Sequence, residues 1–263
     1  MRRFLLCSGV HGKPRSLEWL RQAVADRRPE GVLFAGGVLD SSRKYAARIT
    51  PWELTHEDAV FLVNFFETMG NLGVFSAVIP GSMDTPLEEF LRLGMNAEVE
   101  FPGLHLVHAT LVEKGDVAVC GAGGRICEGR MIETDVCSRT LIEYHLRTLW
   151  TAKQPHKILL LAIPPTGPLG GAEGSRLTSD LIDSYYPSLC VVAGPNECRG
   201  MQRIAHTLVV NPGHLAHGRA AWLDWNRPLE DQVEFFDLRG VESQSMAIET
   251  GVRRQGLARR TPA

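Results

Sequence analysis

Short apolar runs that end in glycine- or proline-rich turns recur along the chain, and helix-like segments separate many of them. The runs have the length of buried strands, and the segments between them carry apolar residues at helical spacing. This alternation predicts an α/β fold in which several strand ends bring their loops to one edge of a sheet, where such folds place their functional sites. The five clearest runs are residues 4–8, 31–35, 74–79, 157–163 and 189–193.

Capping residues indicate where the helices begin. Ser16 precedes an apolar stripe and predicts a helix over 17–27. Thr55 and Asp58 resemble a capping box for a helix that reaches residue 69, and Thr85 is expected to cap a helix with proline at its first position. Further helices are expected over 139–151 and 177–185, and further strands over 104–107, 117–120, 207–210, 220–225 and 233–238.

Composition limits the class of protein. Apolar residues make up 44% of the 263 residues, charged residues make up 22%, and the net charge is −2. These values are ordinary for a globular protein and do not indicate a nucleic-acid partner. No segment approaches the roughly 18 apolar residues of a membrane span, and His11 to Lys13 interrupts the signal-like opening. We therefore expect a cytoplasmic protein with no membrane partner.

The six cysteines form no CxxC pair, and several lie in apolar runs. We expect them to be small, buried and reduced side chains. Cys198, which follows Glu197, has the alternative of a thiol nucleophile. Among the helices, residues 59–66 are apolar beyond a narrow stripe. Burial between a helix and a sheet explains this segment more simply than oligomeric packing does.

The loops after the five runs resemble, in order, the signature of the calcineurin-like metallophosphoesterase family. That signature comprises Asp-x-His, Gly-Asp-x-x-Asp, Gly-Asn-His-Asp/Glu, a histidine before Pro-Pro, and Gly-His-x-His. The resemblance covers about residues 1–239, which we take as one domain, and residues 240–263 are expected to form a flexible polar tail. It implies an α/β (α+β) fold, the four-layer αββα sandwich, and in active members two metal ions that clamp phosphoryl oxygens and activate a water.

Most of the metal ligands that the resemblance implies are absent from this chain. In the first two motifs, Gly9 stands at an aspartate position, His11 is retained, and Gly37 stands at the aspartate that would bridge the metals. Asp40 matches the outer aspartate, which is generally not a ligand. Without a shared anion, two divalent cations at such short separation repel each other strongly.

The remaining motifs show the same loss. Ser82 replaces a ligand asparagine, and Met83 replaces the histidine that would protonate the leaving group. Asp84 is retained, but its implied role is to support that missing histidine. In the later motifs, Ala162, Pro195 and Glu197 stand at histidine positions, and His214 stands where serine or threonine is usual.

These replacements predict a catalytically inactive metallophosphoesterase-like protein that acts as a binding or scaffold module. Its expected partner is another protein, or a small ligand held in the old pocket by backbone amides, and no cofactor is expected. The alternative is a phosphoesterase with an altered, mononuclear metal site. That site would hold one divalent metal (Mn, Fe or Zn) through His11, Glu197 and His214, and His217 is a further histidine near the same loop.

Overall fold

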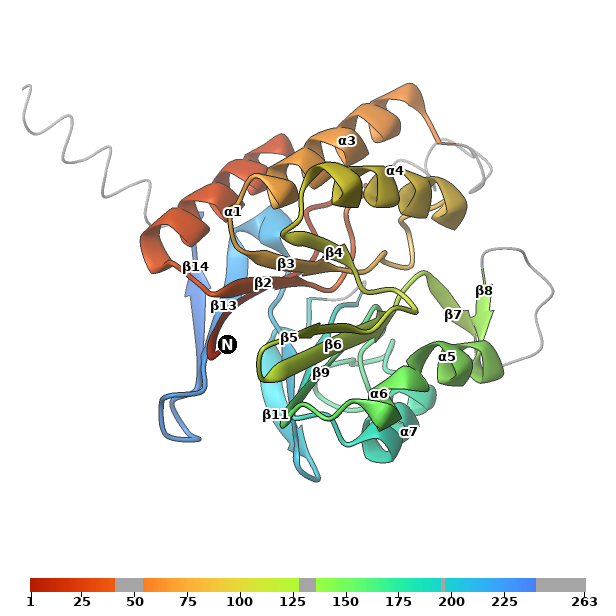
Figure 1. Cartoon of the computed structure of the whole chain (residues 1–263), viewed down its shortest axis with the longest axis vertical. Helices are drawn as coiled ribbons and strands as arrows, with labels where there is room; N and C mark the ends of the chain where they lie inside the picture. Colours follow the sequence, from red (N-terminus) through yellow and green to blue (C-terminus); the bar gives the residue numbers. More distant parts are fainter. Residues whose placement is uncertain (41–53, 128–135, 195–196, 240–263) are drawn as a thin grey trace, which may run out of the picture.

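The computed structural model describes residues 1–40, 54–127, 136–194 and 197–239. Two six-stranded mixed sheets face each other, and helices cover their outer faces (Figure 1). This arrangement confirms the four-layer αββα sandwich. The first sheet has the order β14 (Val233–Asp237), β13 (Arg219–Asp224), β1 (Arg3–Cys7), β2 (Gly31–Phe34), β3 (Phe75–Val78) and β4 (Leu104–Leu106).

The second sheet has the order β11 (Gly200–Ile204), β12 (Thr207–Asn211), β10 (Leu189–Val192), β9 (His156–Leu161), β6 (Val117–Ala122) and β5 (Val112–Lys114). A small parallel pair joins β7 (Arg125–Cys127) to β8 (Val136–Ser138). The helices are α1 (Pro14–Arg27), α3 (His56–Gly70) and α4 (Leu87–Glu100) over the first sheet, and α5 (Arg139–Leu146), α6 (Thr148–Thr151) and α7 (Arg176–Tyr185) over the second.

The alternation of side chains along each strand divides the core into three layers. In β1, Phe4 and Leu6 face the second sheet, whereas Leu5 and Cys7 pack under α1, α3 and α4. In β9, Leu160 lies between the sheets. The residues directly before and after it, Leu159 and Leu161, pack under α5 and α7. Because these strands are buried on both faces, they appear in the sequence as continuous apolar runs.

Two of the three predicted helix caps are wrong and one is confirmed. Ser16 does not cap α1: the helix begins at Pro14, and the Ser16 hydroxyl is buried without a hydrogen-bond partner in the part of the chain that the structure describes. Pro86 is the N-cap of α4 rather than its first residue. Thr55 caps α3 as predicted, since its hydroxyl accepts the Asp58 N–H at 3.1 Å. The segment 139–151 forms two helices, α5 and α6, instead of one.

The aromatic side chains of α3 belong to the core. Leu62, Phe65 and Phe66 are buried beneath the helix, and Phe61 is partly buried there, so the simpler explanation of this apolar helix is confirmed. Four cysteines are buried as expected: Cys7, Cys120, Cys137 and Cys190. None of the helices that the structure describes is both long and apolar enough to cross a membrane. The segment 240–263 lies outside the described residues.

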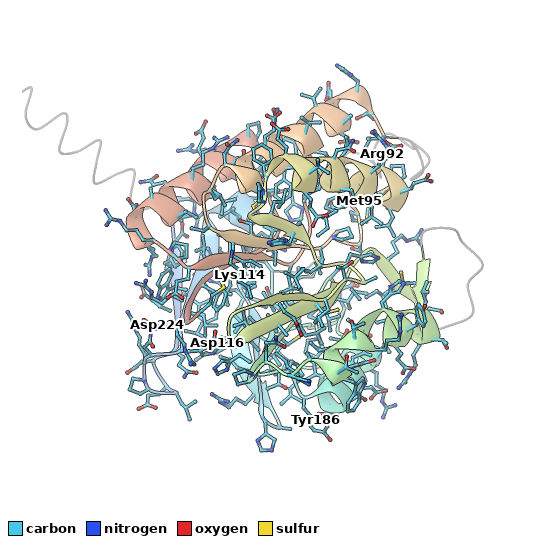
Figure 2. The ribbon with its side chains drawn as sticks, viewed as in Figure 1. Arg92, Met95, Lys114, Asp116, Tyr186 and Asp224 are labelled. Atoms are coloured by element: carbon cyan, nitrogen blue, oxygen red, sulfur yellow. The ribbon has the colours of Figure 1, made fainter. Side chains whose placement is uncertain are left out.

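A polar contact joins the two sheets at the start of β1. Arg2 Nη2 lies 3.1 Å from Oδ2 of Asp116, and the amino group of Met1 contacts Oδ1 of the same carboxylate. Asp116 lies in the turn between β5 and β6 of the second sheet (Figure 2). The loops that follow β1, β2 and β3 lie at the opposite ends of these parallel strands.

Candidate functional site

The carboxyl ends of the parallel strands from both sheets surround one small cavity. Strands β1, β2 and β3 are mutually parallel, as are β9, β10 and β12. The cavity measures about 80 Å³, which is below the roughly 300–1,000 Å³ of ordinary ligand pockets. Its lining contains Gly9, His11, Gly36, Gly37, Gly81, Ser82, Met83, Ala162, Ala193, Gly194 and His214. Seven of the candidate residues from the sequence are therefore brought together here.

The two glycines that the loop motifs align with acidic positions have little room for a side chain in this backbone. Gly9 and Gly37 have φ values of +64° and +81°, a backbone region that strains any residue with a Cβ. A Cβ added at Gly9 would lie 2.8 Å from Nε2 of His11 and 2.8 Å from Cδ2 of His214. A Cβ added at Gly37 would lie 3.0 Å from the Cα of Gly9. The glycine loops pack directly against each other.

His11 and His214 occupy the space above these glycines. Burial and the nearby His214 ring lower the pKa of His11 to about 4, and burial lowers the pKa of His214 as well. Both rings are therefore neutral at pH 7. Nε2 of His214 lies 2.9 Å from the carbonyl oxygen of Gly194, so this nitrogen donates its proton to the backbone.

Asp84 lies beneath the cavity, where its carboxylate accepts hydrogen bonds from four backbone N–H groups. Oδ2 accepts from Gly81 at 2.6 Å and from Gly37 and Val38 at 3.0 Å, and Oδ1 accepts from Leu39 at 2.8 Å. The side chain is 1% exposed. Burial raises the pKa of Asp84, and the four N–H groups oppose that shift. Asp84 thus fixes the β2 and β3 loops to each other.

The remaining candidate positions in these loops supply few groups that could bind a metal ion or transfer a proton. Ser82 and Met83 line the cavity, and Ala162, 4% exposed, contributes only a methyl group. Asp40 does not line the cavity and lies beside Gly12 instead. Pro195 lies outside the described residues.

Glu197 forms a second polar group beside the cavity. Its Oε2 lies 3.0 Å from Nδ1 of His217 and 2.9 Å from Nη1 of Arg219, and its Oε1 accepts the His214 N–H at 3.4 Å. Partial burial raises the pKa of Glu197, but these contacts outweigh burial and the pKa is lowered. One atom each of Glu197, His214 and His217 lie within 4.8 Å of one another, a grouping that could hold one metal ion. His217 rather than His11 completes it among the described residues.

The described residues do not fit the pair of metal ions of active family members. A two-metal site needs several hard oxygen and imidazole ligands and a bridging carboxylate. The cavity instead offers two imidazoles that contact each other, and the Asp84 carboxylate beside it accepts hydrogen bonds from four amides. Sequence reasoning missed Gly36, Gly81 and Arg219 as parts of the site, and it named His217 only as a further histidine near the same loop. Only the glycine-rich loops indicated the first two, and no motif indicated the other two as contacts of Glu197.

Residues 1–235 match the model of the family described as "Metallophosphoesterase, calcineurin superfamily". The chain therefore belongs to this family, as its loop motifs predicted. No curated protein sequence matches it.

Solved structures agree with this assignment. The protein TT1561 of Thermus thermophilus is 25% identical, with a TM-score of 0.74 over 90% of this chain and 99% of that chain. Two more distant structures share the fold alone. A dimetal phosphatase from Danio rerio is 10% identical (TM-score 0.55; 85% of this chain, 92% of that chain). A 5'-nucleotidase from Candida albicans is also 10% identical (TM-score 0.54; 90% of this chain, 52% of that chain).

Proposed function

We propose that this chain is a non-catalytic member of the metallophosphoesterase family that acts as a binding or scaffold module. The observation that carries the proposal is the backbone at Gly9 and Gly37. Both positions have left-handed φ values, and both lack space for the carboxylates that hold metal ions in active members. An enzyme of this class cannot clamp a phosphoryl group without those ligands.

Another protein is the partner class that the site favours over a small ligand. The cavity of about 80 Å³ is small. Several of the amides that would bind an anion already donate to Asp84, including those of Gly37 and Gly81. A surface formed by the loops around the cavity offers more contact area than the cavity itself.

Turnover of a generic aryl phosphodiester and the matching monoester tests the proposal. We expect the purified chain to hydrolyse neither substrate faster than buffer that contains the same Mn²⁺, Fe²⁺ or Zn²⁺. The matched control is His11→Ala, which removes an imidazole from the cavity. Metal-dependent turnover by the natural chain that His11→Ala abolishes would overturn the proposal, because it would place catalysis in this cavity.

The second candidate is a phosphoesterase with one metal ion, supported by the grouping of Glu197, His214 and His217. Against it, Arg219 lies 2.9 Å from the Glu197 carboxylate and partly neutralises the charge that would attract a cation. Glu197→Gln removes the only carboxylate of this grouping. Turnover that survives His11→Ala but is lost in Glu197→Gln would favour this second candidate.

A further inference from the structure

A second cluster of metal-ligating side chains lies away from the glycine-lined cavity. His108 follows β4 and pairs with Gly121 of β6, Cys137 lies in β8, and His145 lies in the last turn of α5. One ligand atom of each lies within 4.8 Å of the other two. The two imidazole rings meet edge to face, with centroids 5.4 Å apart and an angle of 67°. Strand β8 and helix α5 lie side by side at this edge (Figure 1).

The environment of the cluster keeps its two imidazoles neutral. Cys137 and His108 are 4% and 9% exposed, whereas His145 is only partly buried and leaves a path from solvent. Burial and the His145 ring lower the pKa of His108 to about 4, and burial and Arg147 lower the pKa of His145. Both imidazoles are therefore uncharged at pH 7.

Nδ1 of His145 gives the cluster an independent indication of a ligand. This nitrogen is buried and has no hydrogen-bond partner among the described residues. A buried polar atom without a partner costs roughly 1–3 kcal/mol, and each such atom in a folded protein calls for an explanation. A metal ion bound to the nitrogen lone pair would supply one.

We propose that His108, Cys137 and His145 bind a single transition-metal ion, with zinc as the best match. One thiolate and two imidazoles form a borderline-soft donor set, which suits Zn²⁺ better than Mg²⁺ or Ca²⁺. Tetrahedral zinc places sulfur at about 2.3 Å and nitrogen at about 2.0–2.1 Å, so the ligand atoms must approach to roughly 3.3–3.8 Å from one another. The ligand atoms, which now lie up to 4.8 Å apart, would therefore need to move about 1 Å closer together. A solvent water can take the fourth position.

Gly123 makes His108 the weakest of the three ligands. Its N–H donates to Nδ1 of His108 at 3.0 Å, so the ring proton of the neutral imidazole lies on Nε2. A metal ion at Nε2 would require the ring proton to move to Nδ1, and a metal ion at Nδ1 would take the lone pair that accepts the Gly123 N–H, so either mode breaks this hydrogen bond. Cys137 loses its thiol proton to solvent on binding, and His145 binds through the lone pair of Nδ1. Cys137 and His145 therefore carry most of the affinity.

The bound ion would have a structural role. It would fasten β8 and α5 to the end of β6, where Gly121 pairs with His108. The guanidinium of Arg147, whose charge lowers the pKa of His145, lies over the ring of Tyr144 at 3.7 Å from its centroid. It disfavours a cation, so we expect moderate affinity rather than the tightest zinc binding.

Cobalt substitution of the full chain tests this site. We expect one Co²⁺ per chain, with a sulfur-to-cobalt charge-transfer band and the intense visible bands of tetrahedral coordination. Cys137→Ser should remove the charge-transfer band, His145→Asn should weaken binding at least about tenfold, and His108→Asn should weaken it less. The matched control is Cys198→Ser, which changes a cysteine outside the cluster and should leave the spectrum unchanged.

Two results would overturn the proposal. The first is the absence of a charge-transfer band in the natural chain with Co²⁺ in excess, which does not depend on whether any variant folds. The second is a band that persists in Cys137→Ser and disappears in Cys198→Ser, which would place the metal beside Glu197. Neither result bears on the non-catalytic function proposed above, which is judged from turnover alone.

Discussion

The rings of His11 and His214 pack edge to face, with centroids 4.6 Å apart and an angle of 73° between their planes. They come from loops at the ends of β1 and β12, which belong to different sheets. Their contact therefore joins the two sheets at the edge where the glycine-rich loops meet. This pair fills the space that an acidic side chain at Gly9 would need.

Alanine at Gly9 should destabilise the protein more than alanine at Gly115. The two glycines have nearly the same φ, +64° and +61°, but nothing lies within 4 Å of an added Cβ at Gly115. The left-handed backbone costs roughly 1–2 kcal/mol at both positions, and the collision with His11 adds roughly 1–3 kcal/mol at Gly9 alone. Urea denaturation measures both free energies of unfolding. Equal losses in the two variants would show that the cavity has room.

Asp84→Asn should lower the free energy of unfolding by roughly 3 kcal/mol or more. The amide retains one acceptor oxygen and turns an NH₂ group toward backbone N–H donors that are buried. Asp26→Asn, on the exposed face of α1, makes the same change of charge and should cost less than about 0.5 kcal/mol. Similar midpoints in urea for the two variants would contradict the bridging role of Asp84.

Stability should fall as the pH drops from about 6.5 towards 4. Because the pKa of His11 is lowered to about 4 in the folded state, the unfolded chain binds more protons in this window. The stabilisation is therefore complete above about pH 6.5 and is lost on acidification, by at most about 3 kcal/mol for His11. His214, whose pKa burial also lowers, contributes in the same direction.

The pH slope should flatten in His11→Asn, since asparagine tolerates the φ of +48° at this position. His206→Asn is the control, because His206 is exposed. Denaturation midpoints measured between about pH 4 and pH 7 provide the comparison. A slope that His11→Asn leaves unchanged would assign the acid sensitivity to other groups.

Thr55→Ala and Ser16→Ala should differ, although the sequence suggested a capping role for both residues. Thr55 accepts the Asp58 N–H, and its loss should cost about 1 kcal/mol. The Ser16 hydroxyl lies inside α1, buried and without a hydrogen-bond partner among the described residues, so alanine there should be neutral or slightly stabilising. Thermal unfolding of both variants checks this pair, and an equal loss at Ser16 would mean that its hydroxyl does form a hydrogen bond.

The fold followed from the sequence because its strands are buried on both faces. Runs such as 157–163 are unbroken by polar residues after their first position, and their loops occur in the family's order. The short strands at sheet edges showed no such pattern. β11 alternates exposed and half-buried residues, and β5 is only three residues long. Neither segment therefore has the apolar run that distinguishes a buried strand from a loop. The prediction that Ser16 caps the first helix was wrong because proline is equally suited to the first turn of a helix, and the helix begins at Pro14.

The residues around the cavity were predicted in part, and their contacts were not predicted. The motifs identified Gly9, Gly37 and Asp84, since each occupies a family position. That the amides around Gly37 converge on the Asp84 carboxylate depends on the backbone dihedrals of two loops, which no residue pattern specifies. The grouping of His108, Cys137 and His145 joins residues up to 37 positions apart (108 to 145) with no motif between them.

The carboxylate of Asp84 also acts as a tethered anion. Because it is part of the chain, its effective concentration at the four amides exceeds that of a free anion, which reaches the same amides only by diffusion. A phosphate or phosphorylated metabolite would have to displace this carboxylate from all four N–H groups. The loops of β2 and β3 therefore have an internal ligand, and a free anion competes poorly for their amides.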